Sequence, residues 1–181
     1  VVGAPNNDDR RGFALVYVKG ENDKWLQQTK LAAPDGAAGD HFGWSVGIFG
    51  DTIIVGAHGD VDNRGWSGSA HLFVWDGVTW MHLAKLVAPN GASGNTFDGL
   101  FGLASPLDDD AHECCHSVGI YGDTIVIGIY GDNDTRSHSG SAHVFVRDGV
   151  TWTHLAKLVA PDGAASDWFG RSVGIYGDTL V

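Results

Sequence analysis

The sequence repeats itself about every 54 residues, and this repeat constrains the fold more than any other feature. The ten residues Ser45–Ile54 return as Ser117–Val126 and again as Ser172–Val181. One interval is longer than the other by about 17 residues, which indicates an insertion. The chain therefore reads as one domain, 1–181, of three units. The units span about 1–53, 54–125 and 126–181, with the insertion at about 98–116.

Each unit contains four short stretches with the composition of β-strands, separated by turn residues. One complete set falls at about 45–49, 52–57, 69–75 and 79–87, and below we count a unit from the first strand of such a set. Gly50-Asp51 and Asp76-Gly77 are both two-residue hairpin signals, and the second turn would pair His71 with His82. Four-stranded antiparallel units of this length, repeated around an axis, predict an all-β fold of β-propeller blades. A β-solenoid is the rival fold, but its coils are usually shorter.

Charge and hydropathy exclude several classes of partner. The chain has 22 acidic residues against 11 lysines and arginines, for a net charge of −11. Phosphate backbones and anionic membrane surfaces require a cationic face, so we expect no nucleic-acid partner. No apolar run approaches the roughly 20 residues that a membrane-spanning helix needs, so we expect no membrane insertion.

Two short motifs recur in phase with the repeat, and they resemble the FG-GAP repeats of the integrin α-subunit propeller. Phe-Gly stands at 42–43 and 169–170, with Phe97 or Phe101-Gly102 as the altered equivalent beside the insertion. Gly3-Ala4-Pro5 is a literal Gly-Ala-Pro. Altered versions of it stand at Gly56-Ala57-His58 and Gly128-Ile129-Tyr130.

This resemblance implies a seven-bladed propeller, an extracellular or cell-surface setting, and a role in binding or adhesion. The three units would then form part of a larger propeller, or further copies of the chain would complete them by strand pairing. Integrin-type calcium sites lie in an Asp-rich loop between the first two strands of a unit. Here that connection is only Gly50-Asp51, which cannot supply six to eight oxygen ligands, so the family's calcium site does not carry over.

Loop lengths distinguish the two ends of the predicted blades. We call one end the loop end, because the loops between second and third strands and those between units emerge there. The opposite end, the short-turn end, carries the tight hairpins. Long loops rich in Asp, Asn and Gly make the loop end the predicted binding face. The long loops lie at 5–12, 58–68 and 130–140 within units, and at 32–43, 88–116 and 160–170 between units.

Acidic pairs in two of these loops are candidate calcium ligands, since alternating carboxylates in a curved loop can converge on a hard cation. The alternative is that Asp and Asn side chains hold the turns through their own backbone. The candidate ligands are Asp60, Asp62, Asn63, Asp132 and Asp134.

A glycosylation sequon begins at Asn133, in a loop that we expect to be exposed. It makes Asn133 a candidate for glycosylation and the chain a candidate glycoprotein.

The insertion carries His112-Glu113-Cys114-Cys115-His116, which matches the zinc motif H-E-x-x-H. On a helix, His112 and His116 would share a face and bind zinc, with Glu113 as general base. Such a helix would run directly into the strand at Ser117, which leaves little room for a cleft. The alternatives are a structural or adventitious metal site and a plain loop.

Histidines recur at two positions of adjacent strands, His71 with His82 and His143 with His154. Opposed histidines bind zinc or copper in some proteins, but hydrogen bonding between buried blades fits the strand pattern better. Trp25, Trp80 and Trp152 recur at one position and are predicted to lie in the core.

The sequence therefore predicts an extracellular propeller module for protein or glycan binding, adhesion or structural scaffolding, without catalysis. Calcium is the one cofactor suggested. The partner is a protein or glycan at the loop end, or further copies of the chain. The alternatives are a self-assembling surface fibre, and a zinc-dependent hydrolase that uses the insertion.

Overall fold

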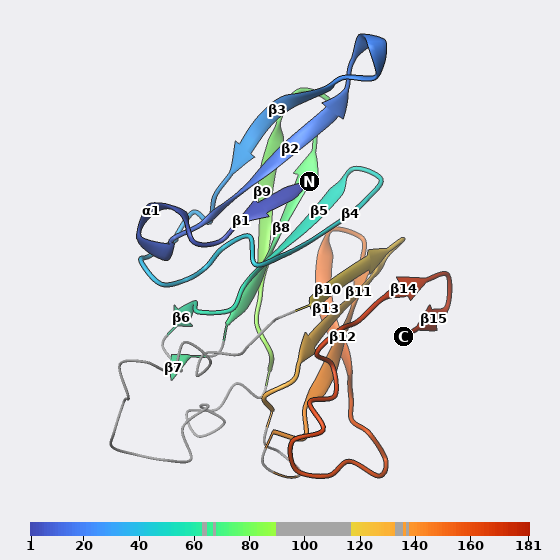
Figure 1. The fold of residues 1–181 in the computed structure, drawn as a ribbon. Helices are drawn as coiled ribbons and strands as arrows, with labels where there is room; N and C mark the ends of the chain where they lie inside the picture. The colour runs from blue at the N-terminus through green and yellow to red at the C-terminus, as the bar shows by residue number, and fades with distance from the viewer. Residues whose placement is uncertain (63–64, 67, 90–116, 133–135, 137) are drawn as a thin grey trace.

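The computed structural model describes the chain except for residues 63–64, 67, 90–116, 133–135 and 137, which Figure 1 draws as a grey trace. The strands form successive antiparallel sheets in chain order. The first contains β1 (Val2–Ala4), β2 (Phe13–Lys19) and β3 (Trp25–Leu31). The second contains β4 (Ser45–Phe49), β5 (Thr52–Ala57), β8 (Ser69–Trp75) and β9 (Trp80–Leu86).

The third sheet repeats the second, and a hairpin follows it. The third contains β10 (Ser117–Tyr121), β11 (Thr124–Ile129), β12 (Ser141–Asp148) and β13 (Thr151–Leu158). The hairpin contains β14 (Ile175–Tyr176) and β15 (Thr179–Leu180). The remaining elements are β6 (Val61–Asp62), β7 (Gly65–Trp66), the helical turn α1 (Asn7–Arg10) and the 3-10 turn Glu21–Asp23.

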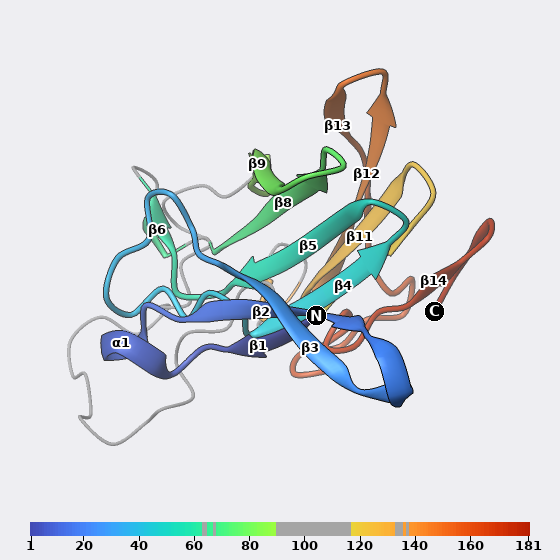
Figure 2. The same ribbon diagram turned by 90° about the horizontal axis from the view of Figure 1, so that it is seen from above.

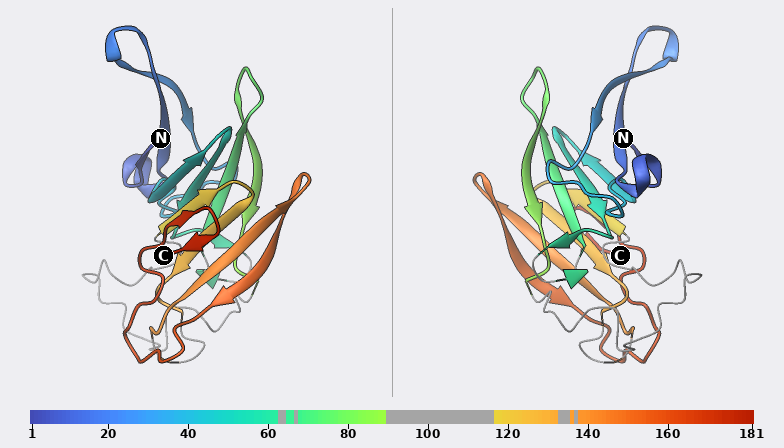
Figure 3. Two further views of the ribbon diagram at one scale, coloured as in Figure 1. Left: turned by 90° about the vertical axis from the view of Figure 1, so that its right-hand side faces the viewer. Right: turned by 90° about the vertical axis from the view of Figure 1, so that its left-hand side faces the viewer.

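The predicted all-β fold of four-stranded, propeller-like sheets is confirmed, and the count of seven blades stays a prediction. The sheets lie face to face in a fan (Figure 3). Their first strands form the line of contact, since β10 lies against both β4 and β14. A Cβ on Gly47 would lie 3.4 Å from Ile120 Cγ2, and one on Gly119 would lie 3.2 Å from Ile175 Cγ2. Glycine at this position therefore lets neighbouring first strands approach closely.

Two hydrophobic clusters fill the spaces between sheets, and β5 contributes to both. Ile53 and Val55 belong to the cluster shared with the first sheet, and Ile54 to the cluster shared with the third. Alternate residues of a strand point to opposite faces, and both faces of this strand are covered. Figure 2 shows the second sheet between its two neighbours. Among the described residues no helix is long and apolar enough to cross a membrane.

The Phe-Gly and Gly-Ala-Pro motifs meet where one unit passes to the next. Phe42 is fully buried, and its ring packs against His71 and Phe73 with centroids 5.4 and 6.0 Å away. A Cβ on Gly3 would lie 1.8 Å from the carbonyl oxygen of Gly43. The equivalent pair in the third unit, Gly128 and Gly170, has the same 1.8 Å approach. Backbone contact at each junction therefore explains why both motifs need glycine.

The predicted turn at Asp76-Gly77 is wrong, and with it the pairing of His71 with His82. The Asp76 carboxylate accepts hydrogen bonds from the Val78 and Thr79 N–H groups at 2.8 and 2.7 Å, which widens the turn and pairs Trp75 with Trp80. A β-bulge between Leu72 and Phe73 then shifts the register. The result sets Phe73 opposite His82, and His71 opposite Lys85.

The prediction that the three recurring tryptophans are core residues is wrong for Trp25. Trp80 and Trp152 pack against the two clusters, but Trp25 is 65% exposed. Trp25 instead lines an open pocket of about 370 Å³ together with Val1, Val2 and Tyr17. Among the described residues β1 pairs with β2 alone and forms one edge of the first sheet.

Candidate functional site

The structure places some of the predicted site residues and leaves others outside the described part of the chain. Asp60 and Asp132 are both buried, at the start of equivalent loops. The backbone of Asp62 lies in β6, but its side chain is not among those described. Predictions for the following residues lie outside the described residues: Asn63, His112, Glu113, Cys114, Cys115, His116, Asn133 and Asp134.

Asp60 lies at the centre of a buried polar network at the loop end. The hydroxyl of Ser69 donates a hydrogen bond of 2.5 Å to its carboxylate. The ammonium group of Lys85 lies 2.6 Å from the same oxygen, and His71 Nε2 lies 3.6 Å away. Both Ser69 and His71 are fully buried. The carboxylate is therefore satisfied by one charge and several donors, as a buried charge requires.

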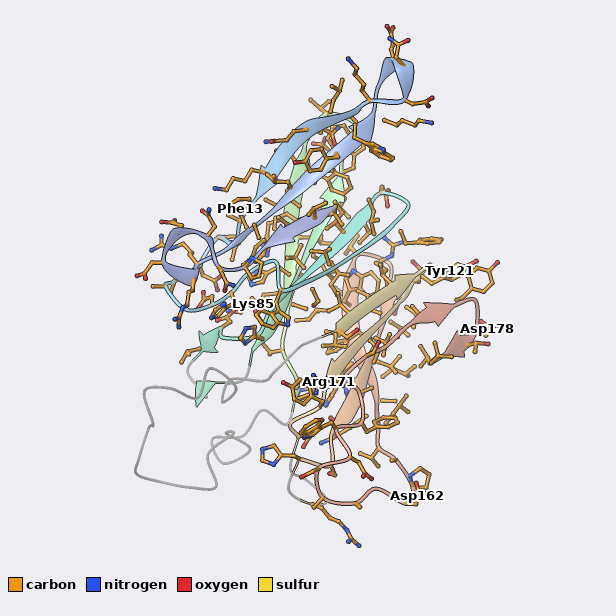
Figure 4. The ribbon with its side chains drawn as sticks, viewed as in Figure 1. Phe13, Lys85, Tyr121, Asp162, Arg171 and Asp178 are labelled. Atoms are coloured by element: carbon orange, nitrogen blue, oxygen red, sulfur yellow. The ribbon has the colours of Figure 1, made fainter. Side chains whose placement is uncertain are left out.

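Lys85 also joins two loops that are far apart in the sequence. Its ammonium group lies 2.9 Å from Asp35 in the loop between the first and second units. Asp60 begins the loop between the second and third strands of the second unit. A strand residue therefore fixes both loops at the loop end, where Figure 4 labels it.

The same network recurs in the third unit and is absent as a set from the first. Asp132 accepts a 2.5 Å hydrogen bond from Ser141, and its carboxylate lies 2.5 Å from the Lys157 ammonium group. The equivalent residues of the first unit are Asn7, Phe13, Leu15, Gln27 and Lys30. Without a carboxylate to bind, Lys30 lies 4.0 Å from the centroid of the Phe13 ring. The acid, the serine and both histidines thus change together between units, which indicates that they act together.

The network shifts the acid–base equilibria of its members. Burial raises the pKa of Asp60, but hydrogen bonds from His71, Lys85 and Ser69 outweigh it and lower the pKa to about 2. The hydrogen bond from Lys85 lowers the pKa of Asp35. Burial opposes the charged form of Lys85, yet its two carboxylate partners raise its pKa. All three groups are therefore charged at neutral pH.

The two histidine pairs hydrogen bond within a sheet, which corrects the prediction of bonding between blades. His71 Nδ1 lies 3.1 Å from His82 Nε2, and His143 Nδ1 lies 3.0 Å from His154 Nε2. Both contacts connect the third and fourth strands of one sheet. The two histidines of a pair are not opposite each other in the strand register. Their rings meet across the β-bulge. Burial, followed by the neighbouring His71, lowers the pKa of His82 and favours its neutral form.

Calcium at Asp60 and Asp132 stays a prediction. In the structure each carboxylate pairs with a lysine side chain. A lysine ammonium group neutralises each of them. Within the described part of the chain, no three His, Cys, Asp or Glu side chains are grouped so as to hold a metal ion. Calcium binding there would have to recruit oxygens from loop residues that are not described.

Two aromatic clusters lie at the loop end, around the equivalent segments 41–44 and 168–171. In the first, the rings of His41 and His58 stack at 4.5 Å, and Trp44 packs edge-on against His58 at 4.3 Å. In the second, the guanidinium of Arg171 lies 5.1 Å from the Trp168 ring and 5.6 Å from the Tyr130 ring. The clusters therefore use the same three repeat positions with different residues, but His58 comes from the unit after its junction and Tyr130 from the unit before its junction.

Sequence reasoning did not single out Lys85 and Lys157. The signal was available, because each lysine shares its unit with an Asp, a Ser and two His, and the first unit has other residues at those four positions. Lysines at strand positions are ordinarily solvated, and only the fold brings these two to a buried carboxylate.

The fold, its sheet order and its junctions define a repeat protein of the β-propeller type. The family model of the FG-GAP repeat matches residues 25–73, 115–145 and 152–181, which together exceed half of the chain. The protein belongs to the FG-GAP repeat family, as its Phe-Gly and Gly-Ala-Pro positions predicted. This family is typical of extracellular or surface proteins and is typically non-enzymatic. The comparison with curated proteins found no match.

Low pH is expected to lower the free energy of unfolding, because it protonates Asp60. Its pKa is about 2 in the folded state against an ordinary 3.8, so its contribution is present above pH 3.8 and is lost as the pH falls toward 2. The shift corresponds to about 2 kcal/mol. Urea unfolding at pH 7, 4 and 3 measures the loss.

Other groups titrate in the same range, and a variant separates them from Asp60. The lowered pKa of His82 adds a loss as the pH falls below 6.5, whereas burial raises the pKa of Asp40 and acts in the opposite direction. Asp60→Asn should be less stable at pH 7 and should lose less stability between pH 4 and 3. An equal acid slope in both proteins would contradict the role given to Asp60.

Proposed function

We propose that this chain is an extracellular propeller module that binds a protein or glycan partner at its loop end, without catalysis. The observation that carries the proposal is the pair of aromatic clusters at equivalent junctions. Trp44 and Trp168 are 41% and 42% exposed, so each presents a large apolar surface to solvent. Half-exposed tryptophans are enriched where proteins bind partners, and their rings also stack on sugars.

The buried networks support the proposal by making the loop end rigid. Lys85 ties Asp35 to Asp60, two residues after His58 of the first cluster, and Lys157 holds Asp132, two residues after Tyr130 of the second. Loops that are ordered before binding cost less entropy when a partner arrives. The fold thus supplies a preformed surface, as expected of a binding module.

A double variant tests this function. Wild-type protein is expected to bind members of a glycan array or of a panel of purified extracellular proteins. Trp44→Ala combined with Trp168→Ala should weaken that binding about tenfold or more, because each ring contributes contact area that alanine cannot replace. Val78→Ser is the matched control, since Val78 is 84% exposed in a turn at the opposite end. Binding that survives the double variant, or no binding to any member of either set, would contradict the proposal.

Two alternatives stay predictions. The zinc-hydrolase reading rests on His112 and His116, which lie outside the described residues. The fibre alternative rests on strand pairing between copies of the chain. The contacts described at the loop end do not bear on it.

A further inference from the structure

A second surface, at the short-turn end, carries a row of aromatic rings that neither hydrophobic cluster uses. Phe49, Tyr121 and Tyr176 are the last residues of β4, β10 and β14, the first strands of successive units. Their ring centroids are 4.7 Å and 5.2 Å apart, so the three rings form a continuous row. We call these three residues the aromatic row.

The aromatic row is open to solvent. Phe49 is 39% exposed and Tyr176 is 80% exposed, although aromatic side chains of a soluble domain are mostly covered. The two hydrophobic clusters contain none of the three rings. Core packing therefore does not explain why an aromatic residue stands at the same place in three successive units.

A second row, of carboxylates, runs beside the first. A Gly-Asp turn follows each ring, which places Asp51, Asp123 and Asp178 two residues further along, and all three are exposed. The turn requires glycine, since φ is +57°, +58° and +57° at the three positions. Figure 4 labels Tyr121 and Asp178 side by side at this end, far from Asp162 at the loop end. A ring and a carboxylate thus recur together at the end of each first strand along one edge of the fan.

The third unit shows what such a turn binds. The Arg147 guanidinium donates a hydrogen bond of 2.6 Å from Nε to the Asp123 carboxylate, and it lies 5.7 Å from the centroid of the Trp152 ring. A guanidinium suits this place because it pairs with a carboxylate through its planar fork and stacks on aromatic rings.

The second unit has the same turn without the arginine. The residue equivalent to Arg147 is Trp75, whose backbone N–H donates to the Asp51 carbonyl at 2.9 Å, as Arg147 does at Asp123. Asp51 accepts the Thr52 hydroxyl at 3.2 Å and forms no ion pair among the described residues. Asp51 therefore resembles Asp123 without its guanidinium, with Phe49 two residues before it and the backbone of Trp75 bonded to its carbonyl.

We propose that the aromatic row and its turn carboxylates bind an arginine-containing segment of a partner protein. One guanidinium pairs with Asp51 and lies against Phe49 and Trp75, and the next lies against Tyr176 near Asp178. The net charge of −11 attracts such a segment over a distance. This surface is separate from the loop end, so the proposal goes beyond the function proposed above.

Fluorescence anisotropy with a labelled hexa-arginine peptide, at about 0.15 M salt, tests the proposal. Asp51→Asn is expected to weaken binding about fivefold, because it removes one carboxylate partner. Tyr176→Ala should weaken it by a similar factor and leave stability unchanged, because that ring is 80% exposed. Trp75→Arg should also weaken binding, since the chain's own guanidinium would then occupy Asp51 as Arg147 occupies Asp123.

The controls separate binding at this site from attraction of the peptide by the net charge of the protein. Asp162→Asn changes the net charge as Asp51→Asn does, but it lies at the loop end, and it should bind like wild type. Hexa-lysine should bind several-fold more weakly than hexa-arginine, because an ammonium group lacks the planar fork. Equal affinities for the two peptides, or equal effects of Asp51→Asn and Asp162→Asn, would overturn the proposal. It would also be overturned if a neutral oligosaccharide bound and Tyr176→Ala abolished that binding, since the row would then be a glycan site.

Discussion

Replacing Lys85 with methionine is expected to destabilise the protein by about 3 kcal/mol at pH 7. The substitution keeps an unbranched side chain only one atom shorter but removes the charge that neutralises Asp60. Breaking a buried ion pair from one side is costly because the remaining carboxylate stays buried without its counter-ion. The pKa of Asp60, lowered to about 2, means that this group remains ionised across the neutral range. Urea unfolding followed by tryptophan fluorescence measures the change.

The first unit offers a matched control for Lys85. Lys30 holds the equivalent strand position, but Asn7 replaces the aspartate there, and the Lys30 ammonium group rests on the Phe13 ring. Lys30→Met should therefore cost less than about 1 kcal/mol. Lys157→Met should behave like Lys85→Met, because Asp132 is buried in the same way. Similar losses from Lys30→Met and Lys85→Met would show that the ion pair is not the cause.

A double variant separates the charge from the packing. Asp60→Asn combined with Lys85→Met removes both charges and should recover part of the loss caused by Lys85→Met alone. Recovery is expected because a neutral amide costs less to bury than an unpaired carboxylate. No recovery would assign the loss to the methionine side chain itself.

Replacing Gly43 with alanine is expected to destabilise the protein by about 3 kcal/mol or more. Gly43 has φ of +94°, where an L side chain is strained. A Cβ there would also lie 2.3 Å from the carbonyl oxygen of Phe13, in the first sheet. The neighbouring Phe42 is fully buried, so the junction cannot easily move to make room. Thermal or urea unfolding detects the loss.

Gly50→Ala separates the cost of a left-handed backbone conformation from the cost of a close contact with another unit. Gly50 has φ of +57°, but nothing lies within 4 Å of the position that a Cβ would occupy. Alanine there should cost only about 1 kcal/mol, the typical penalty for a left-handed residue. Equal losses at the two positions would mean that the contact between units contributes nothing.

The sequence was sufficient for the repeat, the strands and the family. Gly-Asp turns and alternating apolar residues act over a few positions, so they predict strands such as β4 and β5 within a residue or two. Their recurrence in phase then predicts similar sheets that pack on each other. Phe42-Gly43 and Gly3-Ala4-Pro5 were recognisable because each junction repeats the same close backbone contact.

Register was the first property that local signals did not determine. Asp76-Gly77 is a sound two-residue turn signal, but the Asp76 carboxylate caps two N–H groups and widens the turn. A bulge near Phe73 then resets the pairing. The Asp76 cap is local and competes with the two-residue turn that the same residues favour. The bulge has no distinctive sequence signature, because it depends on how the two strands pack against neighbouring sheets.

The partners of the polar residues were decided by tertiary structure alone. Asp60 and Asp132 were assigned to calcium or to turns, because carboxylates in loops do either, and lysines on strands are ordinarily solvated. The fold instead brings Lys85 to Asp60 and, 50 residues away, to Asp35. Short-range preferences of residues such as Gly50 and Asp51 thus determined the strands and tight turns of each unit. Tertiary contacts within and between units, which local propensity does not encode, decided which charges are buried and which rings are exposed.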